Sequence, residues 1–549
     1  MTALLKVALA QINTSVGAID ENVSTIKHFI KKAQEANAEL ILFPEMTVTG
    51  YPPQDLLYEE GFIEANNRAL KEVARVASRI VAVVGFVDTD PSSRGSDGTV
   101  AKFNAAALLK EGKIIGVQHK TLLPTYDVFD ETRYFTAATR HTVFSIGSAK
   151  IGVQICEDLW DEDYLTKVTQ RQVSDGAQAI FNLSASPFYE GKTKLRKDQL
   201  SKKAKEYSTP FFYTNLVGGQ DEQVFDGGSM AVDARGRLIA IAKLFDEDLT
   251  IVDIDISSGE GASISWPGYR KEEQIYRALV LGIRDYFRKT NFTHAIVGLS
   301  GGIDSSLTVA LAVSALGKDR VTGIAMPSDF SSKHSLEDAT ALAKNLDVNF
   351  AVVPIQSVLR SFENTLQGLF KGLPRDVAEE NLQARIRGGI LMALANKRKA
   401  LVVSTGNKTE LALGYCTLYG DMVGGLAAIG DVSKTGVYSL AKFVNDRAGR
   451  NVIPRRVFRK QPSAELRENQ VDPFDYSVIS PLVDEIIERR ATPKVLRKKG
   501  YLRTDIDDTF RRVFAAEYKR RQGPPTIKIT QKAFGIGRKY PVVNRLPTD

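Results

Sequence analysis

The stretch HAIVGLSGGIDSSLTVALA, from His294 to Ala312, predicts the fold of the second half of the chain. A β-like run from His294 to Gly298 enters a loop of small residues, and helix-forming residues begin at Ser305. Small residues let the backbone approach a ligand closely, and the first N–H groups of a helix point outward unpaired. Such a turn binds anions, most commonly polyphosphate. An ordinary glycine-rich turn is the alternative, although SGGIDS is far more restrictive than a lone GxGxxG.

The loop also carries a carboxylate, Asp304, where a Walker A loop would close with Gly-Lys-Ser/Thr. A carboxylate beside a phosphate is repelled unless a divalent cation lies between them, so we expect Mg²⁺ here. The stretch resembles the signature of the N-type ATP pyrophosphatases, which split ATP into AMP and pyrophosphate. The resemblance implies that the ATP contacts are Gly298, Leu299, Ser300, Gly301, Gly302, Ile303, Asp304 and Ser305.

Further β/α units follow this loop. Val321–Met326 and Asn349–Val353 read as strands, and Ser335–Leu346 reads as a helix between them. Leu401–Ser404 is a strand that ends in Thr405-Gly406-Asn407. The pattern predicts a Rossmann-like, doubly wound parallel sheet with ligands at the carboxyl ends of its strands.

The first half also alternates strand-like segments, such as Leu4–Gln11 and Leu40–Phe43, with helical ones, such as Glu21–Asn37. This alternation predicts a layered α/β architecture. The segment SISWPG, residues 263–268, interrupts the pattern with Pro and Gly. We therefore expect one domain over residues 1–262, a linker over 263–272 and a second domain over 273–549.

Three strand ends in the first half carry reactive side chains: Cys156, Glu45 and Lys120. If they converge, Glu45 is a base for the thiol and Lys120 stabilises a thiolate or an oxyanion. A lone cysteine is more often a buried, inert residue. His119 is an alternative partner for the cysteine, but strand alternation lets only one of His119 and Lys120 face the site.

The segments around these residues resemble the nitrilase superfamily. FPEMTVTGYPPQDLL, HKTLLPTYDVFDETRYF and QICEDLW match it in the right order, and the resemblance spans most of residues 1–260. It implies an α-β-β-α sandwich in which Glu45 is the general base, Lys120 stabilises the tetrahedral intermediate and Cys156 forms a thioester with an amide. In glutamine-using members, the resemblance places Tyr126, Ser186 and Lys192 at the glutamine site; a loop aromatic that merely packs is the alternative for Tyr126.

The second half contains NLQARIRGG from Asn381, STGNKTELALGYCTLYGDM from Ser404 and KITQKAFGIGRKYP from Lys528. Glu410 beside Asp304 would complete a two-carboxylate Mg²⁺ site, although an acidic residue in a first helical turn is also favoured by the helix dipole. Lys434 is a candidate contact for pyrophosphate.

Together these motifs resemble the glutamine-dependent NAD⁺ synthetases over nearly the whole chain. The resemblance implies that Thr405 contacts ATP, and that Asn381, Glu410 and Lys532 contact deamido-NAD⁺. One departure is Ser433, where an aromatic residue is common.

The implied activity is that of a ligase that forms a C–N bond with glutamine as the amide donor. Glutamine and ATP are co-substrates, Mg²⁺ is the cofactor, and AMP and pyrophosphate leave as deamido-NAD⁺ becomes NAD⁺. The fusion itself suggests an enclosed passage for ammonia. Another ATP pyrophosphatase-type amidating or tRNA-thiolating enzyme is the main alternative, and a non-catalytic nitrilase-like module is a second. Cys416, the lone thiol of the second half, is interpreted as structural.

The composition limits the possible partners. The 549 residues carry a formal net charge of +8, with basic clusters late in the chain. Nucleic acid, a solvated surface and a phosphorylated substrate all explain such clusters, but no aromatic-interleaved stripe supports the first. No apolar run approaches the roughly 20 residues of a membrane-spanning helix, and the start of the chain does not read as a signal peptide. We therefore expect a cytoplasmic protein with small-molecule substrates, no nucleic acid and no membrane. The two cysteines form no disulfide framework, and the resembled folds imply a homo-oligomer.

Overall fold

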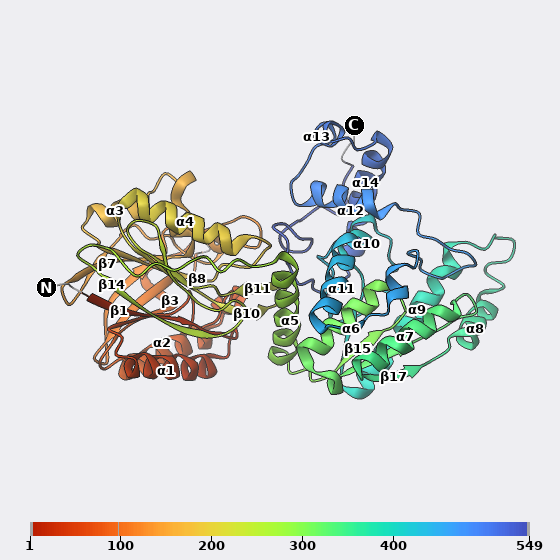
Figure 1. The fold of residues 1–549 in the computed structure, drawn as a ribbon, viewed down its shortest axis with the longest axis horizontal. Coiled ribbons are helices and arrows are strands. Elements are labelled where there is room, and N and C mark those ends of the chain that lie inside the picture. Colours follow the sequence, from red (N-terminus) through yellow and green to blue (C-terminus); the bar gives the residue numbers. More distant parts are fainter. Residues whose placement is uncertain (1–3, 97, 546–549) are drawn as a thin grey trace. The chain divides into compact units, whose positions relative to one another are not determined.

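The computed structural model describes residues 4–96 and 98–545, and the chain divides into two compact units, Met1–Tyr269 and Arg270–Asp549. Every sheet lies within one of the two units (Figure 1). Each unit also has its own buried hydrophobic residues.

Two sheets form the centre of the first unit. One has the order β14 (Asp248–Asp255), β1 (Leu4–Gln11), β2 (Leu40–Leu42), β3 (Val81–Arg94), β4 (Val100–Lys110) and β5 (Lys113–His119). The other has the order β13 (Leu238–Ile241), β12 (Met230–Val232), β9 (Phe211–Asn215), β8 (Ala179–Ser184), β7 (Ala149–Ile155) and β6 (Val143–Ile146). A hairpin of β10 (Val217–Gln220) and β11 (Gln223–Asp226) lies apart from both.

The period-two pattern of β1 explains why the sheets stack. Leu5, Val7 and Leu9 join a core that includes β7 and β8 side chains of the opposite sheet, whereas Ala8 and Ala10 join a core with helical residues. That second core contains α1 (Ile19–Glu35) and α2 (Glu60–Val76). Helices α3 (Val168–Ser174) and α4 (Lys192–Tyr207) cover the other sheet (Figure 1). The predicted α-β-β-α sandwich is confirmed.

The second unit is built on a parallel sheet in the order β17 (Asn349–Val352), β16 (Val321–Ala325), β15 (Ala295–Gly298), β18 (Leu401–Ser404) and β19 (Leu426–Ala427). The chain winds outward from β15 in one direction and then returns to pair β18 on the other side of β15. This reversal creates a switch point at the carboxyl ends of β15 and β18. The predicted doubly wound sheet is confirmed.

The helices of the second unit begin with α5 (Lys271–Lys289), which packs on α6 (Ile303–Leu316). The remaining helices along the sheet are α7 (Lys333–Leu346), α8 (Gln356–Leu366), α9 (Val377–Arg398), α10 (Lys408–Leu413) and α11 (Lys434–Ala448). After them, α12 (Tyr476–Ile487), α13 (Pro493–Lys498), α14 (Arg503–Ala515) and α15 (Glu517–Arg520) follow in the C-terminal segment. A core of Leu482, Val483, Leu496 and Val513 joins α12, α13 and α14 to the end of α10. Short 3₁₀ turns are η1 (Gln54–Tyr58), η2 (Glu131–Arg133), η3 (Cys156–Asp163), η4 (Lys318–Arg320) and η5 (Arg455–Phe458).

Candidate functional site

Cys156 lies at the sharp corner where β7 passes into η3. Its φ of 46° is a left-handed conformation that non-glycine residues adopt at a cost, commonly where a nucleophile is presented. Asp158 holds the corner: its side chain accepts the N–H of Ile155 at 3.1 Å and those of Thr121 and Leu122 at 3.1 and 2.9 Å. The sequence placed Cys156 at the end of the strand, but the strand ends one residue earlier.

A buried ion cluster lies beside the cysteine. Lys120 Nζ donates to Glu45 Oε1 at 2.7 Å and to Glu131 Oε1 at 2.8 Å, and the three side chains are 0–5% exposed. Asn104 donates to Glu45 Oε1 at 2.6 Å, and the N–H of Ala185 donates to Glu45 Oε2 at 2.9 Å. The carboxylate of Glu45 is thereby held in one orientation.

Charge and burial shift the pKa values of Lys120 and Cys156. Burial lowers the pKa of Lys120, but Glu131 and Glu45 outweigh it and raise that pKa well above its usual range. Burial and the neighbouring Glu45 raise the pKa of the Cys156 thiol well above its ordinary value, despite Lys120. The raised pKa of Cys156 favours a neutral thiol over a preformed thiolate.

His119 turns away from the cluster. Its Nε2 lies 2.8 Å from Asp88 Oδ2, and its ring stacks on Phe103 with centroids 4.1 Å apart. The structure thus brings Lys120, and not His119, to Glu45.

The predicted glutamine-site residues have different surroundings. Tyr126 is 53% exposed, and its hydroxyl donates to the Glu157 carboxylate at 3.0 Å, next to Cys156. Ser186 is buried. It directly follows Ala185, whose N–H donates to Glu45. Lys192 begins α4, and its Nζ lies 4.2 Å from the centroid of the Trp160 ring.

Glu131, Asn104 and Glu157 were not singled out from the sequence. Glu131 and Glu157 both lie inside the quoted nitrilase-like segments, so a search of those segments for further carboxylates would have found them. Burial raises the pKa of Glu131 to about 7, although Lys120 opposes this shift.

In the second unit, the loop predicted to bind phosphate, Ser300-Gly301-Gly302, connects β15 to α6. Gly301 has φ 73°, and a Cβ on it would stand 2.2 Å from the Ser335 carbonyl oxygen. The hydroxyls of Ser300 and Ser305 lie 3.2 Å apart. Leu299 and Ile303 are buried in the core, so only the backbone groups of these two residues can face a ligand.

Asp304 and Glu410 do come together, and the ammonium group of Lys434 lies between them. Lys434 Nζ donates to Asp304 Oδ2 at 2.6 Å and to Glu410 Oε1 at 3.1 Å. Asn407 donates to the other Asp304 oxygen at 2.8 Å and caps α10, whose first turn contains Glu410. Burial raises the pKa of Glu410 to about 7 against the opposing effect of Lys434.

Two of the other predicted nucleotide contacts, Thr405 and Asn381, lie at or are linked to the end of β18. Thr405 directly follows β18. Asn381, on α9, accepts the Thr417 hydroxyl at 2.7 Å, Thr417 N donates to Asp421, and the Asp421 carbonyl accepts Ser404 Oγ at 3.2 Å. Lys532 lies two residues after Thr530, which binds Asp431 at 2.8 Å. These contacts link Asn381, but not Lys532, to the end of β18.

The surroundings of Cys416 suit a structural residue. Cys416 is half-buried, and burial raises the pKa of its thiol to about 12.

Among the described residues, no group of three or more His, Cys, Asp or Glu side chains is placed to hold a metal ion. No helix in the described part of the chain is long and apolar enough to cross a bilayer. In the late basic clusters, Arg456 pairs with Glu337 and Asp338, and Arg520 with Glu517.

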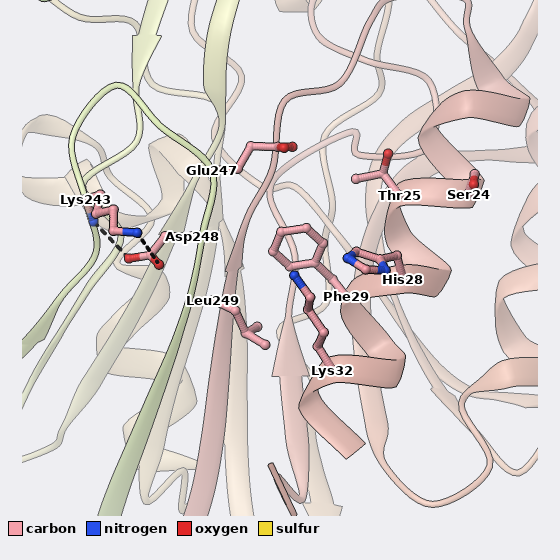
Figure 2. A pocket seen from close by; sticks show the side chains of 9 residues that line it. All are labelled: Ser24, Thr25, His28, Phe29, Lys32, Lys243, Glu247, Asp248 and Leu249. Carbon is pink, nitrogen blue, oxygen red and sulfur yellow. Dashed lines mark hydrogen bonds and ion pairs between the residues drawn. The ribbon is translucent and has the colours of Figure 1, made fainter. Parts of the chain in front are cut away.

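A surface groove of the first unit lies between one face of α1 and the turn before β14. Figure 2 shows His28, Phe29 and Lys32 on the helix facing Glu247 and Leu249. All nine residues that line the groove differ from the residues predicted for the glutamine and nucleotide sites.

Two family models match the chain. The carbon-nitrogen hydrolase model covers residues 6–262, and the NAD synthase model covers residues 275–523. Fold and sites together define a class of ligase in which an amide-hydrolysing unit is fused to a nucleotide-activating unit.

Similar proteins define the family more narrowly than the two family models do. The chain is 43% identical over 551 residues to a glutamine-dependent NAD(+) synthetase of Synechocystis sp., covering 98% of each, and 41% identical over 579 residues to one of Thermotoga maritima, covering 98% of this chain and 99% of the relative. The solved structure of glutamine-dependent NAD⁺ synthetase from Acinetobacter baumannii in complex with ADP has a TM-score of 0.79 at 40% identity, covering 98% of this chain and 99% of that one. The chain belongs to the glutamine-dependent NAD⁺ synthetase family. The tRNA-thiolating alternative is not favoured.

Proposed function

We propose that this chain makes NAD⁺ from deamido-NAD⁺, using ATP for activation and glutamine as the nitrogen source. The observation that carries the proposal is the Lys120 ammonium held between Glu45 and Glu131 beside Cys156, in a chain whose other unit joins an SGGIDS loop to Glu410 and Lys434. One centre releases ammonia and the other consumes it.

At the first centre, Cys156 attacks the side-chain amide carbon of glutamine. Because the thiol starts neutral, Glu45 accepts its proton as the S–C bond forms. The Lys120 ammonium stabilises the oxyanion of the tetrahedral intermediate. Glu45 then returns the proton to the nitrogen as the C–N bond breaks, and ammonia leaves. Water then attacks the thioester carbon and gives its proton to Glu45. Glu45 passes this proton to the sulfur of Cys156 as the C–S bond breaks, and glutamate leaves. Tyr126, Ser186 and Lys192 bind the rest of the substrate.

At the second centre, the carboxylate of deamido-NAD⁺ attacks the α-phosphorus of ATP and displaces pyrophosphate. Residues 298–305 and Thr405 bind ATP, Lys434 contacts the pyrophosphate, and Asn381, Glu410 and Lys532 bind deamido-NAD⁺. Ammonia then attacks the acyl-adenylate, and AMP leaves. Since ammonia is largely protonated in neutral water, local release of the neutral form supports the reaction. Trapping of all glutamine-derived nitrogen by an external ammonia scavenger during turnover would contradict this local supply.

Asp304 and Glu410 are the residues that would hold Mg²⁺. Two carboxylates in the first turns of α6 and α10, which follow the neighbouring strands β15 and β18, fit this cation, which is usually bound by one or two carboxylates together with substrate phosphates. The Lys434 ammonium neutralises part of the charge of these two carboxylates. When bound, Mg²⁺ would spread the negative charge of the departing pyrophosphate.

We further propose domains over residues 1–262 and 273–549 with a linker over 263–272, and self-association into a homo-oligomer. Sedimentation of the purified chain tests the second point: a monomer at micromolar concentration would contradict it.

The proposed function is tested by assaying NAD⁺ and AMP formation with glutamine or with ammonium as the donor. The wild type should use both. Cys156→Ala should lose synthesis from glutamine and retain synthesis from ammonium. Asp304→Ala should lose both while glutamine hydrolysis continues. Retention of glutamine-supported synthesis in Cys156→Ala would refute the proposal.

A further inference from the structure

Ser186 is held by two other elements through its N–H, its carbonyl and its hydroxyl. Its N–H donates to Asn215 Oδ1 at 2.8 Å. Arg196 Nη2 donates to its carbonyl oxygen at 2.7 Å, and Arg196 Nε donates to its Oγ at 3.2 Å. The preceding residue, Ala185, donates its N–H to Glu45 Oε2 at 2.9 Å. Ser186 therefore lies one residue from a direct contact of the proposed catalytic base.

Arg196, on α4, is fully buried and makes all of these contacts within the protein. Its Nη1 pairs with Asp226 at 2.6 Å, and its Nη2 also reaches the Pro187 carbonyl at 3.1 Å. Burial lowers the pKa of the guanidinium, but Asp226 outweighs burial and raises it above its ordinary value. The Arg196 guanidinium has no exposed surface. It can therefore act on a substrate only through the groups to which it is hydrogen-bonded.

The hydrogen bond from Arg196 Nε to Ser186 Oγ affects how that hydroxyl can hydrogen-bond to a substrate. Because Oγ accepts from a guanidinium, its own hydrogen points elsewhere and is polarised as a donor. In glutamine, the amide carbonyl is required at Cys156, and the α-ammonium has no lone pair. The α-carboxylate is the remaining acceptor.

We propose that Arg196 is a positioning residue that turns the Ser186 hydroxyl into a donor for the α-carboxylate of glutamine. The pair thereby selects amides that carry this carboxylate over amides that lack it. The inference rests on the proposed glutaminase activity and deepens it.

The test compares kcat/KM of the full-length protein for glutamine and for 4-aminobutanamide, which is glutamine without its α-carboxylate. Arg196→Lys keeps a positive charge beside Asp226 but cannot reproduce the planar fork. We expect Arg196→Lys and Ser186→Ala each to lower the ratio of the two kcat/KM values about 10- to 100-fold, the worth of a hydrogen bond to a charged group. The loss should be a rise in KM for glutamine, with 4-aminobutanamide unaffected. In the double variant, Arg196→Lys should add nothing to Ser186→Ala.

Lys203 provides a matched control, since it lies on the same helix and also pairs with a buried aspartate, Asp161. Lys203→Arg should leave the ratio unchanged. Equal losses for both substrates, additive effects in the double variant, or the same shift in Lys203→Arg would overturn the proposal. If Arg196→Lys does not fold, Arg196→Gln with Asp226→Asn removes both buried charges together and should lower the ratio equally. A wild type that hydrolyses no glutamine would instead refute the proposed function itself.

Discussion

Replacing Glu131 with Gln should flatten the pH dependence of the first unit's stability. Burial raises the pKa of Glu131 to about 7 from an ordinary 4.5. A carboxyl whose folded pKa is raised contributes stability that is fully present below its unfolded pKa and is lost as the pH rises through its folded pKa. At about 1.4 kcal/mol per pKa unit, the 2.5-unit difference corresponds to about 3 kcal/mol lost between pH 4.5 and pH 7.

The chain has two tryptophans, Trp160 and Trp266, and both lie in the first unit. Tryptophan fluorescence during urea unfolding therefore reports this unit within the full-length protein. The free energy of unfolding of Glu131→Gln, minus that of the wild type, should rise by about 3 kcal/mol from pH 5 to pH 8. Glu64→Gln, at a side chain that is 63% exposed, is the control and should follow the wild type. Parallel curves for the wild type and Glu131→Gln would refute the reasoning.

Two further predictions concern the second unit. Lys434→Met leaves Asp304 and Glu410 adjacent without their shared cation, so synthesis from either nitrogen donor should fall about 100-fold or more while glutamine hydrolysis continues; the exposed Lys442→Met on the same helix should be silent, and comparable synthesis in both variants would contradict this. Gly301→Ala forces a Cβ to within 2.2 Å of the Ser335 carbonyl oxygen at a φ of 73°, so the KM for ATP should rise about tenfold or more. Gly389→Ala on α9 meets open space and should leave that KM unchanged; an unchanged KM in Gly301→Ala would show that the loop does not bind ATP.

The sequence predicts what depends on local periodicity. β1 has the predicted bounds, Leu4–Gln11, because its apolar residues alternate between two buried faces. The proximity of Glu45 and Lys120 could be predicted because both follow strands, and strand ends meet at one edge of a sheet. Their 2.7 Å contact follows that reasoning.

Contacts made by loop and helix residues could not be predicted in this way. Glu131 begins a short 3₁₀ turn, where a carboxylate reads as solvent-exposed, yet it shares the Lys120 ammonium. Arg196 lies in a polar, basic helix, and buried arginines are rare enough that composition favours exposure. Lys434 was predicted to meet pyrophosphate, but its position between Asp304 and Glu410 depends on a packing of three elements up to 130 residues apart.

The most direct test is to supply glutamine labelled with ¹⁵N at its amide, together with ATP, Mg²⁺ and deamido-NAD⁺. The mass of the dinucleotide product is then measured by mass spectrometry. Labelled NAD⁺ formed in step with AMP, and absent in Cys156→Ala, is the predicted result. Unlabelled product, or product accompanied by ADP in place of AMP, would contradict the transfer of nitrogen from the cysteine centre to an adenylated acid.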